Sequence, residues 1–70
     1  MDSTDNSLAD ALPREIERVQ ELIPIYDEIP TGIFAATMMR NSIRAAHMAI
    51  VSGDVIAMLR CYKELKEFHA

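Results

Sequence analysis

The chain has 70 residues, half of them apolar, and a formal net charge of −4 at pH 7. This length fits one small domain, which buries only about 60 % of its unfolded surface and therefore has little stability to spare. The acidic balance excludes a general nucleic-acid binder and a protein attracted to anionic membranes, because both depend on many Lys and Arg side chains.

The cysteine content and the length of the apolar runs exclude further classes of protein. Cys61 is the only cysteine, which excludes an internal disulfide bond and zinc sites of the Cys-rich kind. Residues 1–10 lack the positive charge of a secretory signal, and no apolar run approaches the roughly 20 residues of a membrane span. We therefore expect a cytoplasmic protein without membrane association, metal or cofactor.

The first part of the chain divides into a leader and a helix. Residues 1–11 are polar and acidic, which predicts a disordered leader before a single helical domain over residues 12–70. A helix over about residues 13–28 is predicted by apolar residues spaced 4, 3, 4 and 3 apart: Leu12, Ile16, Val19, Ile23 and Tyr26. Pro13 suits the first helical turn, whereas Pro24 lacks an N–H inside the pattern and predicts a kink or a division.

Two further helices follow. Thr31 is the predicted N-cap of a helix over about residues 32–52, Gly53 its left-handed C-terminal cap, and Asp54 the cap of a third helix over about residues 54–68. The short joint predicts an αα-hairpin. The third helix is expected to turn Val55, Met58, Leu59, Tyr62 and Leu65 inward. The sequence therefore predicts an all-α, three-helix protein.

The middle helix is apolar on two nearly opposite sides. One stripe contains Ala36, Met39, Ile43, Ala46 and Ile50, and the other contains Phe34, Met38, Asn41, Ala45 and Met48. A helix that is apolar around most of its circumference is normally buried. In so short a chain a second copy is the simplest cover, because closed two-fold dimers are the commonest oligomers. We expect a homo-oligomer, first of all a homodimer, packed through the second stripe. The alternatives are a compact monomer and the reverse assignment, in which the second stripe is the core and the first the interface.

The polar flank of the middle helix holds Arg40, Arg44 and His47, and the helix contains no acidic residue. One interpretation is a solvated stripe, partly paired to the acidic first helix. The other is a partner-binding or anion-binding site, because two guanidinium groups one turn apart can bind anionic oxygens and His47 adds a donor. His47 and Cys61 lack a third orienting group and an oxyanion element, so we expect no enzyme.

The segments "LPREIERVQELIPIYDEIPTGIFAATMM" and "SGDVIAMLRCYKELKEF" resemble small all-helical proteins encoded by bacteriophages and prophages, most without assigned function. The resemblance spans about residues 12–68. It implies a bacterial or phage-infected cell and a protein that acts on a host component by occupying its surface.

Two functional hypotheses follow from these features. The first is a non-catalytic protein-interaction module, an inhibitor or adaptor of a bacterial regulatory or defence protein, in which Arg40, Arg44 and His47 recognise an acidic surface. The second is an oligomeric sponge that binds a phosphate-bearing nucleotide signal between subunits.

Overall fold

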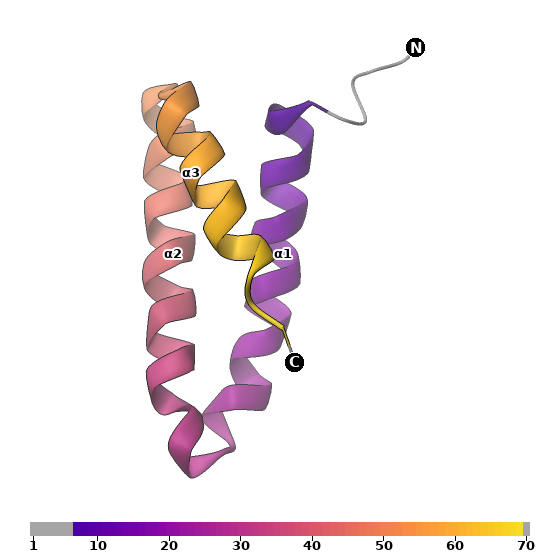
Figure 1. Cartoon of the computed structure of the whole chain (residues 1–70), viewed down its shortest axis with the longest axis vertical. Coiled ribbons are helices and arrows are strands. Elements are labelled where there is room, and N and C mark those ends of the chain that lie inside the picture. Colours follow the sequence, from indigo (N-terminus) through magenta and orange to yellow (C-terminus); the bar gives the residue numbers. More distant parts are fainter. Residues whose placement is uncertain (1–6, 70) are drawn as a thin grey trace.

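The computed structural model describes residues 7–69 of the chain, which form three helices and one short 3-10 turn. Helix α1 (Leu8–Asp27) and helix α2 (Ile33–Ser52) lie side by side and antiparallel, joined by η2 (Pro30–Gly32), and α3 (Val55–Lys66) crosses from α2 towards α1 (Figure 1). Residues 7–69 contain no strand, so the predicted all-α, three-helix class is confirmed.

Helix α1 begins five residues before the predicted start. The Ser7 side chain caps it by accepting a hydrogen bond of 3.2 Å from the backbone N–H of Asp10, and such a cap satisfies a donor that has no partner within the helix. The expected leader over residues 1–11 is therefore wrong for residues 8–11, and residues 1–6 lie outside the described part. Pro13 is also not in the first turn, because α1 starts at Leu8.

The end of α1 and the start of α2 differ from the sequence prediction in two details. Helix α1 continues through Pro24 to Asp27, so a division at Pro24 is wrong. Thr31 does not cap α2, because it lies inside η2, and the N-cap position belongs to Gly32 without a side-chain hydrogen bond.

The joint between α2 and α3 agrees with the prediction. Gly53 adopts the left-handed conformation, with φ of 69°, which a residue without a Cβ adopts at little cost. The Asp54 carboxylate accepts a hydrogen bond of 3.1 Å from the backbone N–H of Ala57 and caps α3. Because one residue ends α2 and the next starts α3, the two helices form the predicted hairpin.

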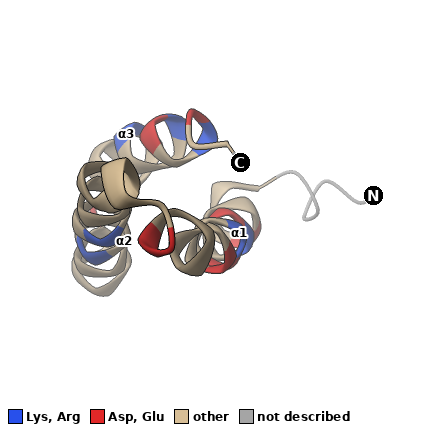
Figure 2. Ribbon diagram, turned by 90° about the horizontal axis from the view of Figure 1, so that it is seen from below, with Lys and Arg blue, Asp and Glu red and all other residues tan. Residues whose placement is uncertain are grey.

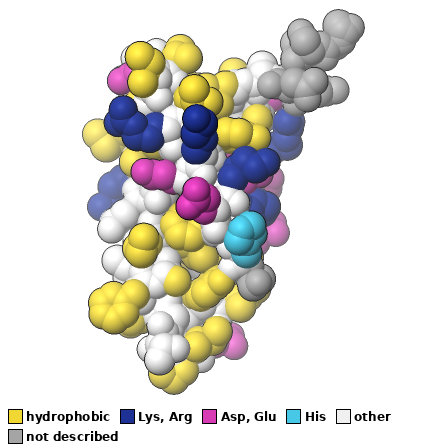
Figure 3. All heavy atoms as spheres, viewed as in Figure 1, with side chains coloured by type: hydrophobic (Ala, Val, Ile, Leu, Met, Phe, Trp, Pro, Cys, Tyr) yellow, Lys and Arg dark blue, Asp and Glu magenta, His cyan; other side chains and the backbone are white. Residues whose placement is uncertain are grey.

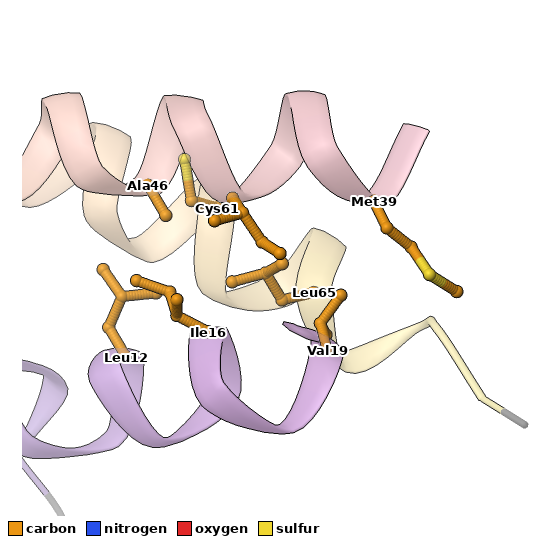
Figure 4. Packing of buried hydrophobic residues seen from close by; sticks show 8 residues of the cluster. Leu12, Ile16, Val19, Met39, Ala46, Cys61 and Leu65 are labelled. Carbon is orange, nitrogen blue, oxygen red and sulfur yellow. The ribbon is translucent and has the colours of Figure 1, made fainter. Parts of the chain in front are cut away.

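The core lies where the three helices meet (Figure 4). It contains Leu12, Ile16, Val19, Met39, Ile43, Ala46, Cys61 and Leu65. The first apolar stripe of α2 faces this core, except that Ile50, near the end of the helix, is partly exposed. The second stripe is on the outer surface.

Helix α3 is rotated relative to the prediction. Val55 and Leu59 were expected inside but are exposed, whereas Cys61 and Leu65 are buried and Met58 and Phe68 are packed against the core. Met58, Cys61, Tyr62 and Leu65 therefore lie on the side of α3 that meets the core, Phe68 follows the end of the helix, and Val55 and Leu59 lie to one side.

Candidate partner-binding surface on α2

The three predicted binding residues lie along one open groove between α1 and α2. This groove has a volume of about 500 Å³ and is named here the cationic groove; its lining residues are Gln20, Ile23, Arg40, Ile43, Arg44, His47 and Met48. The three residues share it because they lie 4 and 3 positions apart on α2, and residues at these spacings share one helix face. Gln20 and Ile23 on α1 form its other side.

The three predicted binding side chains differ in their partners. The Arg40 guanidinium donates to the carboxylate of Asp27 at the end of α1. Arg44 and His47 are exposed and make no hydrogen bond or ion pair with any of residues 7–69. Arg40 is therefore partly neutralised, and Arg44 and His47 are the groups available to an external anion.

Positive and negative side chains are distributed unevenly among the three helices. Figure 2 shows Lys and Arg residues on α2 and α3, whereas many Asp and Glu residues are on α1. The predicted complementarity between α1 and α2 is thus present as the pair of Arg40 and Asp27, although an exposed pair of this kind contributes only about 0.2–1 kcal/mol.

The second apolar stripe of α2 forms a further exposed surface, which shares Met48 with the cationic groove and is named here the outer stripe: Phe34, Met38, Asn41, Ala45 and Met48. The large members are open to solvent, with 79 % of Phe34, 59 % of Met38 and 66 % of Met48 exposed. Hydrophobic side chains also gather over the lower part of α2 in Figure 3. Contiguous exposed apolar surface of this kind marks interaction sites in soluble proteins.

A second groove lies where the outer stripe meets α3. It has a volume of about 390 Å³ and is named here the alanine groove; its lining residues are Ala45, Met48, Ala49, Ser52, Ala57, Arg60, Cys61 and Glu64. Sequence patterning missed this groove, because the α3 side chains reach it only through the observed rotation of that helix. The small side chains at positions 45, 49 and 57 were its only signal in the sequence.

The single thiol has the wrong environment for a nucleophile. Burial raises the pKa of the Cys61 thiol, the nearby Glu64 carboxylate raises that pKa further, and Arg60 partly opposes both. A thiol with a raised pKa stays protonated near neutral pH, and the protonated form is a weak nucleophile. Cys61 therefore acts as a small buried side chain of the core.

The described residues contain neither a metal site nor a membrane-spanning helix. Within residues 7–69, no three His, Cys, Asp or Glu side chains are grouped so as to hold a metal ion, and no helix is long and apolar enough to span a bilayer. No protein-family model, curated protein or solved structure matches the chain.

Proposed function

We propose that this protein is a non-catalytic interaction module that binds an acidic surface of another protein through Arg44 and His47. The observation that carries the proposal is the exposed outer stripe of α2 beside the Arg44 and His47 side chains, which have no partner within residues 7–69. A guanidinium binds carboxylates in a bidentate, directional way, and exposed apolar surface adds contact area.

The cationic groove favours a protein partner because it combines charge with apolar contact. Ile23 and Ile43 line it together with Arg44 and His47. An acidic segment that also carries an apolar side chain can therefore bind Arg44 and His47 and contact the two isoleucines. The resemblance to phage-encoded proteins makes a bacterial host protein in the cytoplasm the proposed partner.

The proposal includes self-association through the outer stripe. Burying one large apolar side chain contributes about 1.5–3 kcal/mol, and Phe34, Met38 and Met48 are each more than half exposed. A homodimer would remove all three from water in both copies.

We further propose a kink at Pro24, because proline cannot donate a hydrogen bond to the carbonyl of Gln20.

The test of the proposed function is capture of interacting proteins from a bacterial lysate by the wild-type protein and by a double variant, Arg44→Glu with His47→Glu. We expect a set of proteins that the wild type retains and the variant loses, while circular dichroism stays helical. The matched control is Lys63→Glu with Lys66→Glu, which reverses the charge of two exposed residues on α3 that line neither groove, and it should retain the same set. Equal capture by all three proteins would contradict the proposal.

A nucleotide sponge is the second candidate, favoured by the same observation that Arg44 and His47 are unpaired within the described residues. Two adjacent cationic groups can bind phosphate oxygens. A ligand at a hundredfold excess over its Kd raises the free energy of unfolding by about 2.7 kcal/mol, and in so small a domain this would shift Tm by about 10 °C or more. A panel of nucleotides that leaves Tm unchanged would exclude this candidate.

A further inference from the structure

The cationic groove is formed by α1 and α2 alone, since none of its lining residues comes from α3. Helix α3 packs against the same two helices through the core. The groove is therefore a further side of the α1 and α2 pair, and no other element of residues 7–69 fills it. From Arg40 to Met48 it follows α2 for about 12 Å, or roughly two helical turns.

The cationic groove combines an apolar floor with polar walls. Ile43 is 7 % exposed and belongs to the core, and Ile23 is half-buried and packs against the core. Gln20 on one wall and Arg44 and His47 on the other are exposed and make no hydrogen bond with any of residues 7–69. None of the lining residues is acidic. An apolar segment placed over the two isoleucines would extend the core, and carboxylates on that segment would meet complementary groups on α2.

We infer that the cationic groove binds an acidic amphipathic helix of the partner protein. The apolar face of that helix lies over Ile23 and Ile43, and two of its carboxylates, one turn apart, face Arg44 and His47. This inference rests on the proposed function and adds to it the shape of the partner's binding segment and the spacing of its charges.

The backbone of the binding segment favours a helix over an extended strand. A helix pairs its own N–H and C=O groups, and a buried backbone group without a partner is costly. An extended segment would lay such groups over Ile23 and Ile43, whose side chains form no hydrogen bonds. Both walls are helical, within Leu8–Asp27 and Ile33–Ser52, so they have no strand edge with which an extended backbone could pair. A helix is therefore the form of peptide that this groove accommodates.

The spacing of the unpaired groups sets the spacing of the partner's charges. Arg44 and His47 lie three positions apart on α2, which places their Cβ atoms about 5–6 Å from each other. Carboxylates at positions i and i+3 or i+4 of a partner helix have the same separation. Arg40 already donates to Asp27, so two carboxylates match the groove and a third opposite Arg40 would have to compete with that pair.

The probes for this inference are three synthetic peptides of about 14 residues, which as helices are long enough to span the groove. The first is held helical by a hydrocarbon staple and carries two glutamates one turn apart beside a leucine face. The second has the same composition and staple, with both glutamates on the opposite face. The third is the first without its staple and with a central proline, which breaks the helix. Fluorescence anisotropy should give the first peptide a dissociation constant at least about tenfold lower than those of the other two.

An exchange of charge separates recognition from folding. The double variant Arg44→Glu with His47→Glu should lose the first peptide and should bind a stapled peptide in which lysine replaces both glutamates, because the charges are then complementary again. An unfolded variant would bind neither. The matched control on α3, Lys63→Glu with Lys66→Glu, should bind the first peptide as tightly as the wild type does. A helical double variant that still binds the first peptide would overturn the inference.

Amide chemical shifts locate the bound helix. The first peptide should change the shifts of Gln20 and Ile23 as well as those of residues 40–48, and changes confined to one of the two helices would overturn the groove as the site. The same changes on concentrating the protein alone would assign the groove to a second copy and would also overturn the inference. If the three peptides bind equally or not at all, the helical shape is wrong, whereas the proposed function stands as long as capture from a lysate depends on Arg44 and His47.

Discussion

The guanidinium of Arg18 on α1 donates a hydrogen bond of 2.8 Å to the backbone carbonyl of Leu65 in the last turn of α3. A second bond of 2.9 Å reaches the carbonyl of Phe68, and the Glu15 carboxylate forms an ion pair of 3.0 Å with the same guanidinium. The last carbonyls of a helix have no partners inside it, and a cation placed there also interacts favourably with the helix dipole. Arg18 thus fixes the end of α3 against α1.

Replacement of Arg18 by alanine should lower the free energy of unfolding by about 1–2 kcal/mol, because hydrogen bonds from a charged donor contribute about 1.5–3 kcal/mol and this side chain is partly exposed. Urea unfolding followed by circular dichroism measures the change. Arg44→Ala is the control, since Arg44 is exposed and unpaired within residues 7–69, and it should change stability by less than about 0.5 kcal/mol. Equal effects would refute the role given to Arg18.

Gly53→Ala should destabilise the protein by about 1–2 kcal/mol through backbone strain alone. A Cβ at Gly53 would contact nothing within 4 Å, but φ is +69°, where a Cβ is unfavourable. Gly32→Ala should cost more, because there a Cβ would overlap the backbone carbonyl of Tyr26. Thermal unfolding of the two variants should rank Gly32→Ala below Gly53→Ala, and the reverse order would contradict this account.

Asp54→Ala should remove the N-cap of α3 and cost about 0.5–2 kcal/mol. The carboxylate of Asp54 accepts the backbone N–H of Ala57 at 3.1 Å, and that donor would otherwise lack a partner within the helix. Asp54→Ser retains an acceptor and should restore most of the loss. If the serine variant is as unstable as the alanine variant, the side-chain cap is not the source of the stability.

The raised pKa of Cys61 predicts a loss of stability at alkaline pH. The thiol of the unfolded chain, with a pKa of about 8.5, loses its proton before the buried thiol does. Since the unfolded state then binds fewer protons, the free energy of unfolding falls as the pH rises above the unfolded pKa, and the contribution is fully present below it. Urea titrations from pH 7 to pH 10 should show this fall relative to Cys61→Ala. Parallel curves for the two proteins would contradict it.

Much of the fold follows from local signals in the sequence. The Gly53 and Asp54 joint was predictable, because a left-handed cap and a side-chain cap each depend on one residue type. The two stripes of α2 were also predictable, because each follows the helical period along one element. The sequence could not predict which of the two stripes enters the core, because that depends on where α1 and α3 pack against α2.

The errors arose where tertiary contacts decide the outcome. Val55 and Leu59 fit the helical period of α3, but the position of α3 against both other helices leaves these two side chains exposed. Arg18 fits an exposed position on α1, and its role depends on Leu65, which is 47 residues away in the chain. The early start of α1 followed from Ser7, a capping residue hidden in a polar and acidic segment.

The candidate site was predictable as a face of one helix but not as a groove. The spacing of Arg40, Arg44 and His47 placed them together, as the structure confirms. The pairing of Arg40 with Asp27 and the contribution of Gln20 from α1 required the packing of two helices. The sequence predicted three residues on one helix face, and the structure distinguishes Arg40, which is paired with Asp27, from Arg44 and His47, which have no partner within residues 7–69.

The central claim is that a second copy covers the exposed apolar side of α2. Sedimentation equilibrium of the wild-type protein at micromolar concentration tests it most directly. The account predicts a helical species of twice the chain mass of 7.9 kDa, which Phe34→Ala converts to a monomer. A single well-folded species of 7.9 kDa across the whole concentration range would contradict it.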